Sequence, residues 1–123
     1  MLRALVAITA AFALTTCSAG GEPEKKLSLS VLYVGNPSTP RGKAYTEFLT
    51  RHFRKVEAAE RKGFDPKTAE PFDVVILDWS QQERPEKPTS PFGPKESWSK
   101  PTVLLGSAGL LLADAWEIVG TIG

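Results

Sequence analysis

The chain has 123 residues, of which 41% are hydrophobic and 24% are charged, with 10 Gly, 10 Pro and a single Cys. This is the composition of one ordinary globular domain, and it excludes a disordered chain, a collagen-like chain and a fold held by disulfides. Lys and Arg total 15 against 14 Asp and Glu, so the chain lacks the basic excess of a nucleic-acid-binding protein and we expect no such partner.

The first 19 residues have the layout of a secretory signal peptide. They carry a positive charge at Arg3, an apolar run from Ala4 to Leu14, and then small or polar residues. The apolar run is shorter than the about 20 residues that span a bilayer as a helix. We therefore predict an exported protein of the periplasm or cell envelope, with residues 1–19 removed as its signal.

Two cleavage positions fit this signal. The sequence Leu14-Thr15-Thr16-Cys17 resembles the lipobox of bacterial lipoproteins, in which the Cys becomes the lipidated N-terminus. That resemblance implies lipidation at Cys17 and a membrane contact through this anchor alone. Thr16 departs from the Gly, Ala or Ser of the pattern, and ordinary cleavage after Ala19 is the alternative.

The body of the protein begins with a predicted strand. Residues 20–26 are polar and form a short tether. The run Leu27–Gly35 then starts with alternating apolar residues and becomes continuously apolar at Val31–Val34. Continuous apolar runs of this length are typical of strands that are buried on both faces of a parallel sheet.

A helix is predicted after the turn-forming residues 35–43. Thr39 is a candidate N-cap, and Pro40 suits the first helical position, where a backbone N–H has no partner in the helix. The range Lys55–Ala59 fits either the last turn of this helix or a short second strand, and the periodicity leaves both open. The apolar residues of the predicted helix recur at the spacing of one face: Tyr45, Phe48, Leu49, His52, Phe53 and Val56.

Two further strands are predicted, at Phe72–Trp79 and Thr102–Leu105, and residues 108–119 show helical spacing. Between them, residues 80–101 form a Pro-rich insertion with four prolines at a period of three. That period places the prolines on one edge of a polyproline II helix. We expect a stiff surface loop here, with Phe92 and Trp98 folded back as a lid over the ligand crevice.

Strands that alternate with helices indicate right-handed crossovers and a parallel sheet. The predicted fold class is therefore α/β, a flavodoxin-like or Rossmann-like sheet with helices on both faces, formed by residues 27–123. Such sheets have about five strands. Three firm strands and one doubtful strand are found, so we expect the domain to be incomplete at its C-terminal end.

Ligands of open parallel sheets bind beyond the carboxyl ends of the strands. The loop 35–43 leads from such an end to a helix N-terminus, which favours a small polar or anionic ligand. It is no P-loop, because six residues separate Gly35 from Gly42-Lys43 and Ala44 follows. No cofactor is expected, and one Cys with one His makes no metal cluster. The candidate ligand-binding residues are Asn36, Ser38, Thr39, Arg41, Lys43 and Asp78.

Ser107 lies between the last predicted strand and the last predicted helix, with Gly109 two residues later. This placement resembles the nucleophile elbow of the class I glutamine amidotransferase-like superfamily, including its ThuA-like members. The resemblance implies catalysis by Ser107 and a His that follows it in the chain. His52 precedes it, on the apolar helix face, and reads as a core or boundary residue. We predict binding of a small polar ligand or a protein partner without catalysis; the alternative is a Ser-dependent hydrolase or amidotransferase-like enzyme truncated before its His.

Overall fold

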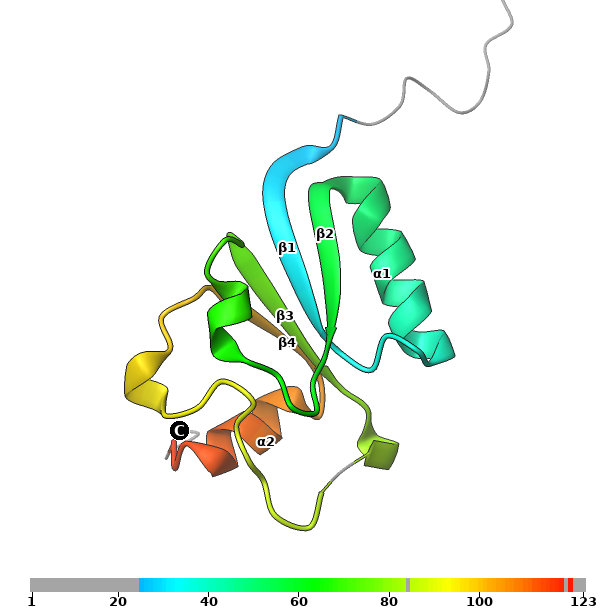
Figure 1. The fold of residues 1–123 in the computed structure, drawn as a ribbon. Coiled ribbons are helices and arrows are strands. Elements are labelled where there is room, and N and C mark those ends of the chain that lie inside the picture. The colour runs from blue at the N-terminus through cyan, green and yellow to red at the C-terminus, as the bar shows by residue number, and fades with distance from the viewer. Residues whose placement is uncertain (1–24, 84, 119, 121–123) are drawn as a thin grey trace, which may run out of the picture.

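Four parallel strands form a single sheet in the order β2-β1-β3-β4 (Figure 1). The computed structural model describes residues 25–83, 85–118 and 120. The order is the beginning of the flavodoxin-like order 2-1-3-4-5, so the predicted α/β class is confirmed. The elements are β1 (Leu27–Gly35), α1 (Pro40–His52), β2 (Phe53–Glu60), η1 (Pro66–Ala69), β3 (Val74–Trp79), η2 (Gln81–Glu83), η3 (Lys95–Ser97), β4 (Thr102–Gly106) and α2 (Ala108–Ala115).

The central strands are apolar throughout because both of their faces are covered. Residues Val31–Val34 of β1 pair with β2 on one side and with β3 on the other. Their side chains alternate, so Leu32 and Val34 face α2 while Val31 and Tyr33 face α1. The helices therefore lie on both faces of the sheet, as the sequence predicted.

Helix α1 begins as expected and ends early. The Thr39 hydroxyl accepts a hydrogen bond from the Gly42 N–H at 3.1 Å, and Pro40 occupies the first helical position. The helix ends at His52, so the prediction that Phe53 and Val56 lie on its apolar face is wrong. Both belong to β2, and the open choice for Lys55–Ala59 is resolved as a strand. Sheet pairing with β1 provides the backbone bonds that further helical turns would have made.

Two aromatic residues of the insertion, Phe92 and Trp98, pack on the α2 face of the sheet. Phe92 is buried and stacks on Trp98, with ring centroids 3.9 Å apart and an interplanar angle of 7°. The Trp116 indole N–H donates to the Gly93 carbonyl at 2.8 Å. Phe92 and Trp98 are thus part of the core and its border, and the expectation that they form a lid over the carboxyl ends of the strands is wrong.

A polar contact ties the opposite, amino-terminal edge of the sheet. The Ser30 N–H and hydroxyl donate to Asp73 Oδ2 at 2.8 and 2.9 Å, and the Asp73 N–H returns a bond to the Ser30 carbonyl at 3.0 Å. The bonds from the Ser30 backbone and side chain lower the pKa of Asp73. This contact aligns β1 with the start of β3.

Candidate functional site

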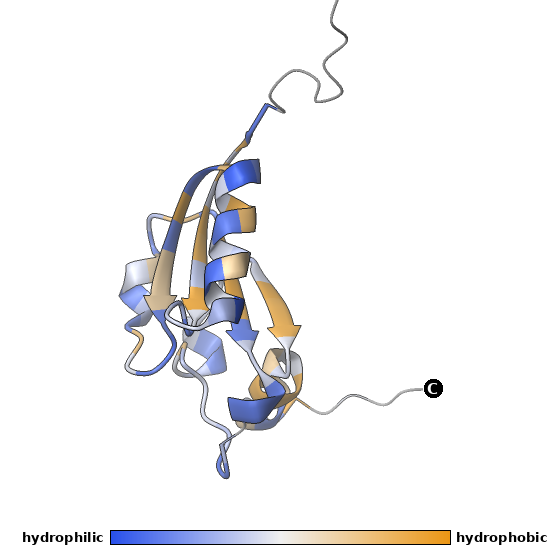
Figure 2. Cartoon of the chain, turned by 90° about the vertical axis from the view of Figure 1, so that its right-hand side faces the viewer, coloured by the Kyte–Doolittle hydropathy of each residue, from blue (hydrophilic) through white to orange (hydrophobic). Residues whose placement is uncertain are grey.

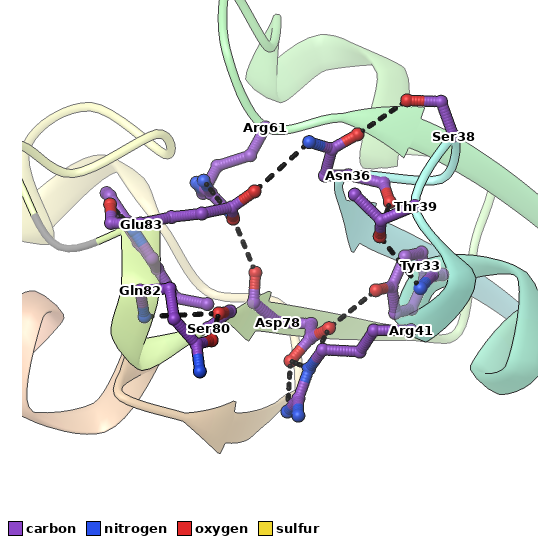
Figure 3. A network of polar contacts seen from close by, with 12 residues as sticks. Tyr33, Asn36, Ser38, Thr39, Arg41, Arg61, Asp78, Ser80, Gln82 and Glu83 are labelled. Carbon is purple, nitrogen blue, oxygen red and sulfur yellow. Dashed lines mark hydrogen bonds and ion pairs between the residues drawn. The ribbon is translucent and has the colours of Figure 1, made fainter.

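A buried carboxylate lies at the carboxyl end of the sheet. Asp78 is 3% exposed and accepts a hydrogen bond from the Tyr33 hydroxyl at 2.6 Å. The Arg41 guanidinium binds both carboxylate oxygens, with Nε 3.0 Å from Oδ2 and Nη2 2.9 Å from Oδ1 (Figure 3). Two-point binding of this kind fixes the plane of the guanidinium as well as its distance.

The three residues meet because of strand alternation and the short connection after β1. Tyr33 pairs in register with Ile76, and Asp78 lies two residues further along β3. Because side chains alternate along a strand, Tyr33, Ile76 and Asp78 all lie on the face covered by α1. Arg41 belongs to the first turn of α1, which begins five residues after the end of β1. The chain therefore returns the guanidinium to the strand ends that it has just left.

Burial and the hydrogen bonds to Asp78 set the protonation states of Tyr33 and Arg41. Burial, and then the hydrogen bond to Asp78, raise the pKa of Tyr33 above its ordinary value. The hydrogen bond to Asp78 raises the pKa of Arg41 as well. At neutral pH Tyr33 is therefore a neutral donor and Arg41 is charged, which together compensate the buried charge of Asp78.

A second ion pair borders the first. Arg61 directly follows β2, and its Nη1 donates to the Asp78 backbone carbonyl at 2.9 Å while Nη2 binds Glu83 at 3.0 Å. Its guanidinium also lies over the Trp79 ring, 4.1 Å from the centroid. Glu83 in turn accepts a bond from the Asn36 amide at 3.1 Å (Figure 3). Residues that follow β1, β2 and β3 are thus joined in one network.

Two adjoining hollows open at this edge of the sheet, and Arg41 lines both. The Arg41 side chain is 42% exposed although the side chain of its buried partner Asp78 is only 4% exposed. The first hollow, about 340 Å³, is lined by Asn36, Thr39, Pro40, Arg41, Arg61, Asp78, Ser80, Gln82 and Glu83. The second, about 370 Å³, is lined by Arg41, Ser80, Gln81, Gln82, Gly106 and Ser107.

The structure places the candidate binding residues in different roles. Asn36, Arg41 and Asp78 lie together at the first hollow. Thr39 lines it too, but its hydroxyl is occupied by the helix cap and by a 2.7 Å bond to the Asn36 carbonyl. The Ser38 hydroxyl donates to Asn36 Oδ1 at 2.8 Å and so orients that side chain. Lys43 is exposed and lines neither hollow.

Sequence reasoning missed two members of the network, Arg61 and Glu83. Arg61 follows a strand end, which is the signal that pointed to Asp78. That signal could not be used, because the spacing left open whether residues 55–59 form a strand at all. Glu83 lies in the insertion after β3, where its polar neighbours Gln81 and Gln82 gave no reason to prefer it.

Ser107 lines the second hollow beside Arg41, but the residue with the left-handed backbone conformation in this turn is its neighbour Gly106. Gly106 has a φ of 64°, whereas Ser107 has a φ of −84°. A Cβ on Gly106 would collide with the Trp79 carbonyl, so this position requires glycine. His52 is the last residue of α1, a helix of 13 residues that starts at the carboxyl edge of the sheet. At 1.5 Å per residue, His52 lies about 20 Å from that edge, so it does not serve Ser107 as a base.

Comparison with protein-family models finds no match for the chain, and comparison with curated proteins and with solved structures finds none either. Within residues 25–83, 85–118 and 120, no helix is long and apolar enough to cross a membrane. The same residues contain no group of three or more His, Cys, Asp or Glu that could share a metal ion. Cys17 and the predicted signal lie outside the described residues.

The raised pKa of Tyr33 predicts a distinct alkaline titration. Because the protonated form is favoured by folding, its contribution to stability is fully present below about pH 10, the ordinary tyrosine value, and is lost as the pH rises further. The chain has two tyrosines, so Tyr45→Phe leaves Tyr33 as the only phenol. We expect its absorbance at about 295 nm to rise only above the pH at which free tyrosine ionises.

Two further variants, made in the Tyr45→Phe protein, identify what raises the pKa of Tyr33. Asp78→Asn removes the charge that holds the Tyr33 proton, so the titration moves towards ordinary tyrosine without reaching it, since burial remains. Tyr33→Phe abolishes the signal and lowers the free energy of unfolding at neutral pH by about 1.5–3 kcal/mol, the range for a hydrogen bond to a charged group. A Tyr33 titration at the free-tyrosine pH in the folded protein contradicts the assignment.

Proposed function

We propose that this is an exported protein that binds a small polar ligand bearing one negative charge, at the carboxyl edge of its sheet and without catalysis. The observation that carries the proposal is the Arg41 guanidinium, which a buried carboxylate holds in place while almost half of the side chain faces solvent in two hollows. Such preorganisation removes the cost of ordering a long side chain when a ligand binds.

The atoms around Arg41 indicate the charge of the ligand. Nε and Nη2 bind Asp78, and within the described chain no hydrogen bond is made by Nη1. The second hollow adds the Ser107 hydroxyl and the start of α2, which has no acidic residue in its first turn and no side-chain cap. Helix N-termini and guanidinium groups both favour anions. Arg61 uses Nη1 on the Asp78 carbonyl and Nη2 on Glu83, whereas Arg41 Nη1 remains directed to the ligand, so we infer that one small anionic group such as a carboxylate binds there.

Arg41→Ala is expected to abolish binding of a carboxylate probe, and Lys43→Ala is the matched control because Lys43 is exposed outside both hollows. Binding of acetate is followed by the NMR shifts of the Gly106 and Ser107 amides. Arg41→Lys keeps a positive charge near Asp78 but loses the two-point geometry, so we expect acetate affinity to fall at least about tenfold. Equal acetate affinity in wild type and Arg41→Ala would remove this site.

The amidotransferase-like alternative is supported by the position of Ser107 in the same hollow. Catalysis by Ser107 needs a base, and the described residues that line its hollow include no His, Asp or Glu. We therefore expect a fluorophosphonate probe to leave Ser107 unmodified, with Ser107→Ala as the matched control, read by intact mass. Labelling that disappears in Ser107→Ala would favour the hydrolase over the binding protein.

The export part of the proposal is supported by the charge and hydropathy layout of residues 1–19. Expression in a bacterial host and mass spectrometry of the mature N-terminus distinguish its two forms. A diacylglycerol-modified start at Cys17 supports the lipoprotein, and an unmodified start at Gly20 supports ordinary secretion. A chain that keeps Met1 and stays in the cytoplasm contradicts export altogether.

A further inference from the structure

Strand β4 lies at an open edge of the sheet but has the composition of an interior strand. Among the described residues it pairs with β3 alone, and its sequence TVLLG contains no charged residue. Val103 and Leu104 point to opposite faces and are 47% and 41% exposed. Figure 2 shows hydrophobic colouring along this edge strand. A further strand beside β4 would pair with its outer backbone groups and place side chains next to Val103 on one face and Leu104 on the other.

The other edge strand is protected in the usual way. β2 exposes charged side chains along its length, which discourages pairing with another sheet. β4 itself carries no charged residue. Lys100 precedes it and donates to the Glu70 and Phe72 carbonyls at 2.7 and 2.6 Å, beside β3. Arg41, which lies near Gly106 at the end of β4, is paired with Asp78. The charged residues of β2 are Arg54, Lys55, Glu57 and Glu60.

The hydrogen bonds to β3 show which backbone groups of β4 point outward. The Val75 N–H donates to the Pro101 carbonyl at 3.0 Å, and the Ser107 N–H donates to the Trp79 carbonyl at 2.8 Å. Odd-numbered residues of this segment therefore face β3. Because the direction alternates along a strand, the N–H and C=O groups of Thr102 and Leu104 face the open edge.

We propose that β4 pairs with β4 of a second copy of this chain, antiparallel and centred on Leu104, to give one sheet across a two-fold axis. Two-fold symmetry makes equal edge strands antiparallel and places each residue opposite its symmetry mate at the centre. The two Leu104 residues then exchange both backbone hydrogen bonds, and Val103 lies opposite Leu105 of the other copy. All of these side chains are apolar, so no like charges oppose one another.

The surface beside Leu104 favours the same partner. An apolar hollow of about 310 Å³ runs between β4 and α2, and Leu104, Trp116 and Ile118 are among its lining residues. Ile118 is 51% exposed. Pairing of β4 with β2 of another copy would instead bring the charged strand against this apolar surface, and its repetition would give filaments.

A charge exchange at the symmetry centre tests the proposal. Sedimentation of the full chain is expected to give the mass of two chains. Leu104→Lys and Leu104→Glu each place like charges opposite one another, so each alone is expected to sediment with the mass of one chain. Mixed in equal amounts, the two variants are expected to recover the double mass, because opposite charges then meet at the axis.

Controls separate this result from misfolding and from other partners. Ala58→Lys and Ala58→Glu introduce the same charges on exposed β2 and should leave the wild-type mass unchanged. In the wild type, the Leu104 amide should exchange slowly with solvent at high concentration and rapidly on dilution, which needs no variant. A wild type that stays monomeric with a rapidly exchanging Leu104 amide, or variants that fail to recover on mixing, overturns the proposal.

Discussion

The buried carboxylate of Asp78 is the constraint on which the functional end of this molecule depends. A charge taken out of water is stabilised only if charged and hydrogen-bonding partners replace the water. Tyr33 comes from β1 and Arg41 from α1, so satisfying Asp78 fixes two neighbouring strands and the first turn of a helix at once. The position of Arg41 towards solvent is a consequence of that requirement.

The need to pair buried charges also fixes the guanidinium groups of Arg41 and Arg61 in position. Arg41 is oriented by Asp78, and Arg61 is held by Glu83, by a backbone carbonyl and by the Trp79 ring. Arg41 and Arg61 are each paired with one carboxylate, so the network has little net charge. It therefore offers a ligand mainly the fixed positions of its hydrogen-bond donors. A site of this kind suits recognition of a small polar group, which is the basis of the function proposed above.

A strand with apolar residues on both faces has different consequences in the interior of this sheet and at its edge. Apolar residues on both faces of β1 and β3 form the core, because helices cover them and strands flank them. In β4 the same pattern leaves Val103 and Leu104 exposed, with backbone groups directed outward. β2 carries the charges that an edge strand normally needs. The contrast is what makes β4, and not β2, the surface for a second copy.

By itself, the sequence determined the fold class: the apolar runs at Val31–Val34 and Val74–Leu77 indicated a buried parallel sheet, and Thr39-Pro40 defined the start of α1, because these signals are local. It could not choose between helix and strand at residues 53–60, where the spacing fits both and pairing with β1 decided. It also could not show that Asp78 is buried and bound to Arg41, or that Arg61 and Glu83 join them, because those contacts link residues distant in the chain. Only the tertiary structure brings them together.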